Sequence, residues 1–105
     1  MRIDKMINSR QRAQLRGMAN QLDVIVHVGK GGISDNLVTQ VNDALEAREL
    51  IKGKVLDNSL LTAREVCDEL CQLCRAEPVQ TIGSKFVLYR ESRTMDKEKR
   101  IKLVK

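Results

Sequence analysis

The feature that most constrains the fold of this chain is a glycine-rich loop between a strand-like run and a helix-like run. The loop is Gly29-Lys30-Gly31-Gly32, and the run before it is Val24-Ile25-Val26-His27-Val28. The helix after it opens near Ser34 and covers about residues 35–47, with apolar residues at helical spacing. A strand that turns through glycines into a helix indicates an α/β fold.

The same loop has the composition of an anion site. Glycines let the backbone approach a ligand closely, and the following helix N-terminus presents unpaired N–H groups and the positive end of its dipole. Lys30 adds a full charge, and the G-x-x-G spacing is the one with which KH-type modules clamp an RNA backbone. The nucleotide-hydrolysing P-loop pattern, G-x-x-x-x-G-K-[ST], is absent. A phosphate site and a plain tight turn are the two interpretations of this tetrapeptide.

One further helix and one further strand flank this unit in the sequence. Apolar residues recur at helical spacing over residues 9–22, where Ser9 is a suitable N-cap. Residues 50–56 are typical of a strand, and Lys52 and Lys54 share one face of it because side chains alternate along a strand.

The clearest helix start is a capping box at Thr62 and Glu65, in which each residue's side chain accepts from the other's backbone N–H. The helix stops before Pro78, since a proline disfavours helical backbone in the residue before it. Residues 79–82 and 86–89 then form two short strands across a Gly-Ser turn.

The resulting order, α-β-α-β-α-β-β, predicts a single compact α/β domain with a mixed sheet and helices on both faces. The domain spans residues 1–105, with a core over about residues 8–90 and a basic tail over residues 91–105. The short apolar end of the tail adds an edge strand or stays loose. The charges of the tail are either solvated or in contact with RNA.

Positive charge is concentrated at the two ends of the chain, which carries a net charge of +5. Residues 1–34 hold six basic and two acidic side chains. Residues 35–89 hold six basic and nine acidic side chains, and residues 90–105 hold seven basic and three acidic side chains. A mildly acidic middle between two basic ends favours a polyanion-binding face over a uniformly basic surface.

The composition excludes several classes of protein. With no Trp, one Phe and one Tyr, the chain cannot build an aromatic platform on which nucleic-acid bases stack. It has no stretch of 18 apolar residues, so we expect no membrane span. The first residues, Met1–Met6, lack the apolar core of a signal peptide, and we therefore expect a cytoplasmic protein.

Three cysteines, Cys67, Cys71 and Cys74, have the C-x-x-x-C-x-x-C spacing with which radical-SAM enzymes hold a [4Fe–4S] cluster. Here they fall at i, i+4 and i+7 of a capped amphipathic helix, so they lie toward one face. Cluster ligands usually sit on a loop, whereas free cysteines behave as small buried hydrophobes. We expect core packing, and a structural or redox metal is the alternative.

A catalytic constellation is not evident in the sequence. His27 is the only histidine, and we expect it to be a half-buried strand residue rather than a base. The carboxylates of Glu46 and Glu49 fall on a helix surface, where we expect them to be solvated. We therefore predict that the chain is not an enzyme and uses no cofactor.

Four dispersed motifs carry a resemblance to a known family. They are Val28-Gly29-Lys30-Gly31-Gly32-Ile33, Glu49-Leu50-Ile51-Lys52, Val79-Gln80-Thr81-Ile82-Gly83 and Val87-Leu88-Tyr89-Arg90. With the basic run Arg10-Gln11-Arg12-Ala13-Gln14-Leu15-Arg16, they resemble the CRM domain (chloroplast RNA splicing and ribosome maturation), and most closely its stand-alone bacterial YhbY-like form. The likeness covers roughly residues 8–90 in the right order.

This resemblance implies a compact α/β fold similar to the C-terminal domain of a translation initiation factor. It also implies RNA binding through the GxxG loop and a basic surface, and association with precursors of the large ribosomal subunit. The partner is then ribosomal RNA, and we expect a monomer with no membrane attachment. Two residues depart from the family pattern. Gly53 stands where the family usually has a β-branched residue, which weakens the strand or marks a close backbone approach. Gly31 stands where the family often has a residue with a side chain.

The predicted RNA-binding residues are the glycine loop and the cations around it: Gly29, Lys30, Gly31, Gly32, Arg12, Arg16, Lys52 and Lys54. Lys85 of the predicted hairpin is a further candidate. Two alternatives stay open: an iron–sulfur or redox protein built on Cys67, Cys71 and Cys74, and a protein adaptor whose basic ends meet an acidic partner.

Overall fold

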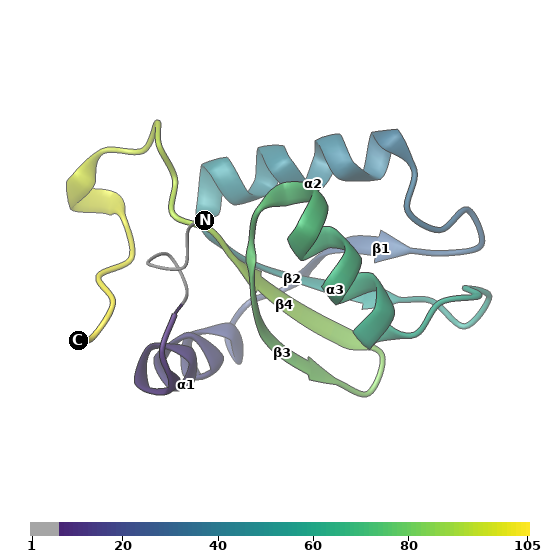
Figure 1. Ribbon diagram of the computed structural model, residues 1–105, viewed down its shortest axis with the longest axis horizontal. Helices are drawn as coiled ribbons and strands as arrows, with labels where there is room; N and C mark the ends of the chain where they lie inside the picture. Colours follow the sequence, from purple (N-terminus) through teal and green to yellow (C-terminus); the bar gives the residue numbers. More distant parts are fainter. Residues whose placement is uncertain (1–6) are drawn as a thin grey trace.

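Three helices and a four-stranded sheet follow one another in the predicted order in the computed structural model, which describes residues 7–105 (Figure 1). The elements are α1 (Ser9–Ala19), β1 (Val24–Val28), α2 (Asp35–Arg48), β2 (Leu50–Val55), α3 (Ala63–Cys74), β3 (Glu77–Ile82), β4 (Lys85–Tyr89) and the short 3-10 helix η1 (Lys97–Lys99). Residues 1–6, over which we expect no signal peptide, lie outside the described part. No helix within the described range is long and apolar enough to cross a membrane.

The sheet is mixed, as predicted, with the strand order β1-β2-β4-β3. The strands β1 and β2 are parallel, whereas β4 runs antiparallel to both of its neighbours. The edge strand β3 begins at Glu77 and contains Pro78, although the sequence predicted a start at residue 79. An edge strand tolerates proline because one of its sides needs no backbone donor.

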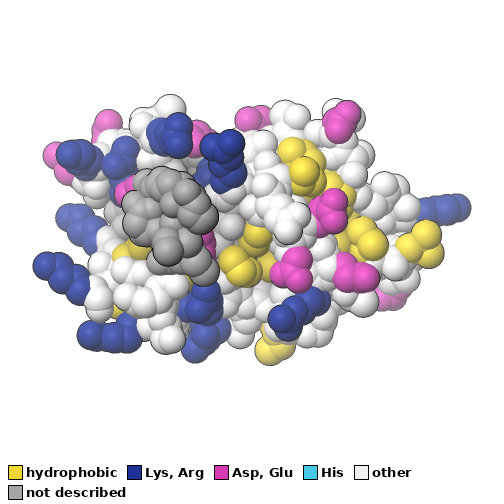
Figure 2. All heavy atoms as spheres, in the orientation of Figure 1, with side chains coloured by type: hydrophobic (Ala, Val, Ile, Leu, Met, Phe, Trp, Pro, Cys, Tyr) yellow, Lys and Arg dark blue, Asp and Glu magenta, His cyan; other side chains and the backbone are white. Residues whose placement is uncertain are grey.

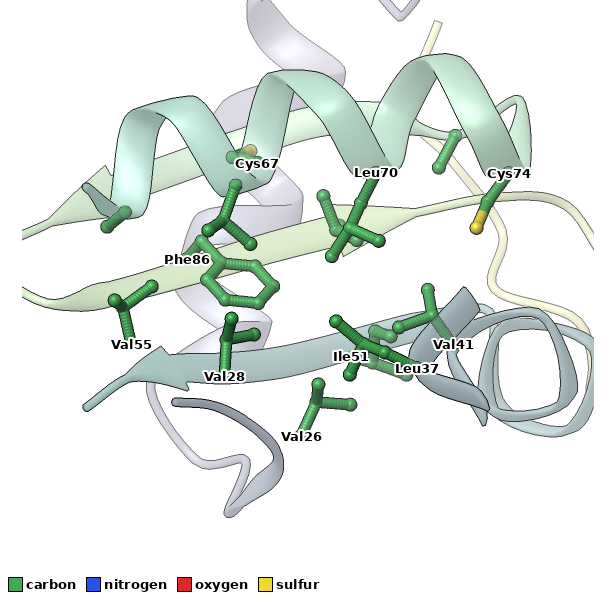
Figure 3. Close-up of a cluster of buried hydrophobic side chains, with 14 of the residues drawn as sticks. Val26, Val28, Leu37, Val41, Ile51, Val55, Cys67, Leu70, Cys74 and Phe86 are labelled. Atoms are coloured by element: carbon green, nitrogen blue, oxygen red, sulfur yellow. The ribbon is translucent and has the colours of Figure 1, made fainter. Parts of the chain in front are cut away.

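Helices cover both faces of the sheet, as predicted. On one face, α2 and α3 enclose the larger core, and Figure 3 shows the Phe86 ring beneath α3, between Cys67 and Val28. On the other face, Leu15 of α1 packs into a smaller cluster with Tyr89 and Leu50. Each fully buried side chain of this size contributes about 1.5–3 kcal/mol to stability.

The close packing of Phe86 explains the glycine in the middle of β2. Gly53 pairs with Phe86 across the sheet, and the ring is fully buried. A Cβ built on Gly53 would overlap the ring atoms of Phe86. Of the two interpretations of Gly53, the close approach is therefore confirmed: the glycine makes room for the ring of the neighbouring strand.

The N-cap predicted for α1 is wrong by one residue. Asn8, not Ser9, caps the helix: the Asn8 side chain accepts from the Gln11 N–H at 2.8 Å, and the Gln11 side chain accepts from the Asn8 N–H at 3.0 Å. An Asn and a Gln three residues apart form the same reciprocal pair as Ser and Glu. The helix ends at Ala19, short of the predicted residue 22. The capping box predicted for α3 is confirmed, with both hydrogen bonds present.

The C-terminal segment, residues 91–105, neither adds an edge strand nor stays loose. Its end lies along α1, where the Gln14 amide donates to the Lys102 carbonyl at 2.9 Å and accepts from the Val104 N–H at 2.9 Å. The side chains of Ile101 and Leu103 pack on the smaller cluster beneath α1. The apolar end of the tail therefore closes the core on this face of the sheet.

The expectation that Glu46 is a solvated surface residue is wrong. One oxygen of its carboxylate accepts from the Ser92 hydroxyl, the Arg93 N–H, the Thr94 N–H and the Thr94 hydroxyl, at 2.7–3.0 Å. These bonds, led by the Thr94 N–H and the Ser92 hydroxyl, lower the pKa of Glu46 from 4.5 to about 2. Glu46 thus holds the start of the tail against the last turns of α2.

The expectation that Glu49 is solvated is also wrong, because this residue is completely buried. It ends α2 with a left-handed φ of 68°, which turns its side chain into the fold. Its two carboxylate oxygens accept from the Ser92 N–H and the Ile101 N–H, each at 2.7 Å. A charge-assisted pair of this kind is worth more than a neutral hydrogen bond, and here it joins both halves of the tail.

Candidate nucleic-acid interface

The glycine loop forms a closed turn. The Gly32 N–H donates to the Gly29 carbonyl at 3.0 Å, and Gly32 has φ of +66°, which a β-branched side chain rarely adopts. Two residues later, the Ser34 hydroxyl caps α2 by accepting from the Leu37 N–H at 3.2 Å. The loop thus leads directly into the helix N-terminus, and Lys30 is exposed at its tip.

The three glycines of the loop have different surroundings. A Cβ on Gly29 would lie 3.3 Å from the Asn58 side-chain oxygen, so the neighbouring loop is close to it. A Cβ on Gly31 or on Gly32 would meet nothing within 4 Å. Gly31 is therefore the position at which a side chain fits most easily, since Gly32 has the left-handed backbone and Gly29 the close neighbour.

Strand register places three lysines on the face of the sheet that carries α1. Lys52 pairs with Val87, which packs in the cluster beneath α1. Because side chains alternate along a strand, Lys54 lies on the same side as Lys52, as predicted. Lys85 is the register partner of Lys54 on β4, and His27 is the partner of Lys54 on β1. His27 is exposed, so the expectation that it is half-buried is wrong. We call Lys52, Lys54 and Lys85 the lysine face.

The lysine face runs toward the glycine loop. The Leu56 N–H donates to the Val28 carbonyl at 2.8 Å, which holds the loops after β1 and β2 together. The Val55 N–H donates to the Ser84 carbonyl at 2.7 Å, which places the β3–β4 turn at the same end of the sheet as these two loops. Figure 1 shows these three connections side by side at the right, a region that we call the glycine-loop end.

The two arginines predicted for the site lie elsewhere. The Arg12 Nε donates to the Pro78 carbonyl at 3.1 Å, so this guanidinium is held against β3. Pro78 is near the start of β3, whose neighbour Glu77 pairs with Tyr89 at the end of β4, opposite the glycine-loop end. Arg16 lies one turn further along α1 and is exposed. The structure therefore places Lys54 and Lys85 at the glycine-loop end, Lys52 further along β2, and the two arginines on α1.

The cysteines pack as predicted. Cys67 and Cys74 are buried in the larger core, and the half-buried Cys71 packs against it. Burial raises the pKa of the Cys74 thiol, and a hydrogen bond with Cys67 together with burial raises that of Cys71. Figure 3 shows Cys67 and Cys74 apart along α3, each among apolar side chains. Within residues 7–105, no three or more His, Cys, Asp or Glu side chains are grouped so that they could hold a metal ion.

Arg90, the last residue of the four family motifs, connects three parts of the fold, which the sequence did not reveal. The Arg90 guanidinium donates to the Cys74 carbonyl at the end of α3 and to the Asn42 side chain of α2, both at 2.8 Å. It also pairs with Glu46 at 3.3 Å. Arg90 therefore ties α2, α3 and the start of the tail together. No local motif marks it, because its three partners are distant in the sequence.

A mixed sheet covered by helices on both faces, with a glycine loop at one end and lysines on the face that carries α1, defines a small α/β module. The family model of the CRS1 / YhbY (CRM) domain matches residues 7–90. The "Probable RNA-binding protein YqeI" of Bacillus subtilis is 46% identical over 88 residues, which cover 84% of this chain and 92% of that protein. An "RNA-binding protein" of Haemophilus influenzae is 33% identical over 86 residues, which cover 82% of this chain and 87% of that protein.

A solved structure agrees with the sequence relatives. The solution structure of the hypothetical protein SAV1595 from Staphylococcus aureus superimposes with a TM-score of 0.77 at 43% identity, over 94% of this chain and all of that one (100%). The chain belongs to the CRS1 / YhbY (CRM) domain family, and the resemblance drawn from the four motifs is confirmed. The family match ends at residue 90, so the docked tail lies beyond it.

Proposed function

We propose that this chain is an RNA-binding protein that holds the phosphate backbone of structured RNA and performs no chemistry on it. The observation that carries the proposal is the position of Lys54 and Lys85 at the end of the sheet that bears the glycine turn, with Lys52 further along the same face. The names of the Bacillus and Haemophilus relatives, both described as RNA-binding, support it.

The geometry suggests where a phosphate would lie. Apart from the Leu37 N–H, which the Ser34 hydroxyl caps, the first backbone N–H groups of α2 have no partner inside the helix. In the turn beside them, Lys30 is the one residue with a side chain, and the three glycines leave the backbone open to a ligand. Asp35 already places a negative charge in the first turn of α2. A phosphate is therefore better placed over the turn and Lys30 than on the helix axis, with Lys54 and Lys85 beside the neighbouring nucleotides.

The RNA would be recognised by its shape and backbone rather than by stacked bases. Phe86 and Tyr89, the only Phe and Tyr of the chain, are both buried, so neither ring is open to a base. Burial also raises the pKa of Tyr89 to about 12. Double-stranded RNA is the form that proteins recognise mainly through phosphates and 2′-hydroxyl groups.

A salt titration tests the electrostatic part of the proposal. Four to six neutralised phosphates predict a log–log slope of binding against salt of about −3 to −5. A filter-binding titration with a structured ribosomal RNA fragment measures this slope. A flat response would contradict phosphate binding, and salt-sensitive binding to an acidic protein but not to RNA would favour an adaptor instead.

We further propose that the natural RNA belongs to precursors of the large ribosomal subunit, which the CRM resemblance implies. The test is sedimentation of a cell lysate at low salt. The protein is expected in the fractions of large-subunit precursors, and to leave them when the RNA is digested. Equal distribution over all RNA-containing fractions would contradict this more specific role while leaving RNA binding intact.

A further inference from the structure

The docked tail carries a second group of cations, which neither the family match nor the glycine loop accounts for. Residues 91–105 lie beyond the matched residues 7–90. Their exposed basic side chains are Arg93, Lys97, Lys99, Lys102 and Lys105, which we call the tail patch.

The way in which the tail is docked leaves these charges on the surface. Glu46 and Glu49 accept backbone N–H groups and hydroxyls from the tail, not its lysines. Gln14 likewise binds the backbone of Lys102 and Val104. A segment held by its backbone keeps its charged side chains directed to solvent at defined positions, unlike a loose tail that must be ordered when it binds.

The tail patch lies far from the glycine loop. Figure 1 shows the tail and α1 at the left, opposite the glycine-loop end. In the same orientation, Figure 2 shows Lys and Arg side chains gathered over the tail and α1, while acidic and apolar side chains dominate the middle of the molecule. The longest dimension of the molecule is 39 Å, which corresponds to about a dozen nucleotides at roughly 3.4 Å each along one strand.

We propose that the tail patch is a second contact site for an RNA phosphate backbone, so that one RNA duplex long enough to span the molecule touches both ends. This inference rests on the proposed RNA binding and adds a requirement for RNA length. A short duplex would occupy the glycine-loop end alone. A long duplex would gain the phosphate contacts of the tail patch, and its affinity would respond more strongly to salt.

The test compares two double variants that each remove two positive charges. Lys97→Gln with Lys102→Gln alters the tail patch. As the matched control, Arg64→Gln with Arg75→Gln alters an exposed residue of α3 and the exposed residue that follows this helix. Each protein is titrated with duplex RNAs of about 6 and about 20 base pairs. On the long duplex, the tail variant is expected to lose roughly fivefold in affinity and about 1.5 units of salt slope, because each lost phosphate contact removes about 0.7–0.9. The control variant should lose less than twofold.

The two duplexes separate the outcomes. Equal losses on the short and long duplexes would overturn the second site, since they would show a general effect of net charge. No loss on either duplex, with a parent that binds RNA, would also overturn it. A parent protein that binds neither duplex would refute the proposed function itself, and a tail patch that binds an acidic protein instead of RNA would point to an adaptor.

A third variant tests whether docking matters. Glu46→Gln keeps every lysine and makes the protein more positive, so simple charge attraction predicts tighter RNA binding. If the tail must be held in place, affinity for the long duplex falls while affinity for the short duplex does not. An increase on the long duplex would show that a loose tail serves equally well and would overturn the role of the docked geometry.

Discussion

The glycine loop and the docked tail of this molecule both present cations, but they are held by interactions of different range. In the glycine loop, the turn is closed by residues three apart and the cap of the following helix by residues three apart. At the tail end, Glu46 binds the Ser92 hydroxyl across 46 positions, and Gln14 binds Val104 across 90. The first kind of interaction leaves a motif in the sequence, and the second leaves none.

This difference has a consequence for stability. The glycine loop needs only its own turn and the cap of α2, whereas the tail is held by a few carboxylate and amide groups and by the packing of Ile101 and Leu103. Because docking a flexible segment costs conformational entropy, each of these groups must offset part of that cost. The tail end is therefore the one that single substitutions should disrupt most.

The largest effect is expected from Glu49→Ala, which leaves the buried N–H group of Ser92 and the part-buried N–H group of Ile101 without an acceptor. Each orphaned donor costs about 1–3 kcal/mol, so we expect the free energy of unfolding to fall by about 2–6 kcal/mol. Glu69→Ala, on the exposed surface of α3, is the control and should change it by less than about 0.5 kcal/mol. Urea denaturation measures both, and equal small changes would show that the tail is not essential to the fold.

The glycine loop is tested by Gly32→Val against Gly83→Val. Both glycines have a left-handed φ, +66° and +59°, and open space around a Cβ, so both variants carry the same backbone strain. Gly83 lies in the β3–β4 turn of the same end, so Gly83→Val measures what backbone strain near Lys85 costs. The Gly32 variant should lose about tenfold more RNA affinity than this control. Lys30→Ala should lose less, about 0.5–1 kcal/mol or roughly two- to fivefold, because it removes one exposed charge and keeps the backbone donors. Circular dichroism must first show folded variants. If folded Gly32→Val binds as the parent does, the loop is only a turn.

Acid should release the start of the tail. Hydrogen bonds lower the pKa of Glu46 to about 2 from the ordinary 4.5 that it has in the unfolded chain. Its contribution is therefore complete above about pH 4.5 and is lost as the pH falls toward 2. An NMR titration that follows the Arg93 and Thr94 amides should show this release. In Glu46→Gln the carboxylate-dependent step should be absent, and an identical titration would assign the step to another group.

The smallest effect is a gain at the loop. A Cβ on Gly31 meets nothing within 4 Å, so Gly31→Lys adds a second charge beside Lys30 without crowding the turn. We expect RNA affinity to rise about two- to fivefold at low salt. Gly31→Gln is the uncharged control and should bind as the parent does. A loss of affinity in both variants would mean that the RNA approaches the backbone of residue 31 too closely for any side chain.

Most of the fold could be predicted because its elements are marked locally. The capping box at Thr62 and Glu65, the glycine loop and the end of α3 before Pro78 all follow from nearest-neighbour chemistry. The N-cap of α1 was missed although its signal was present, since Asn8 and Gln11 also fit the capping pattern. The strand order and register were not predictable, because sequence periodicity shows which face a residue takes but not which strand lies beside it.

The candidate site divides in the same way. Lys52 and Lys54 were assigned to one face from their spacing alone, and the register then added Lys85. That Arg12 and Arg16 lie on one side of α1 was also inferred from their spacing. That α1 holds Arg12 against Pro78, away from the glycine loop, depends on tertiary contacts that the spacing does not show. Glu46 and Glu49 were misjudged for this reason: exposure on an isolated helix says nothing about a segment that returns to cover it.

By itself, the sequence determined the class of fold, the glycine turn, the burial of the cysteines and membership of the CRM family. These follow from interactions between residues close together in the chain, or from motifs that survive as strings of letters. The tertiary structure alone decided that Gly53 makes room for Phe86, that the lysines and arginines occupy different ends, and that the tail is docked. Each of these depends on which distant segments meet, and contact energies between such segments exist only once the whole chain has folded.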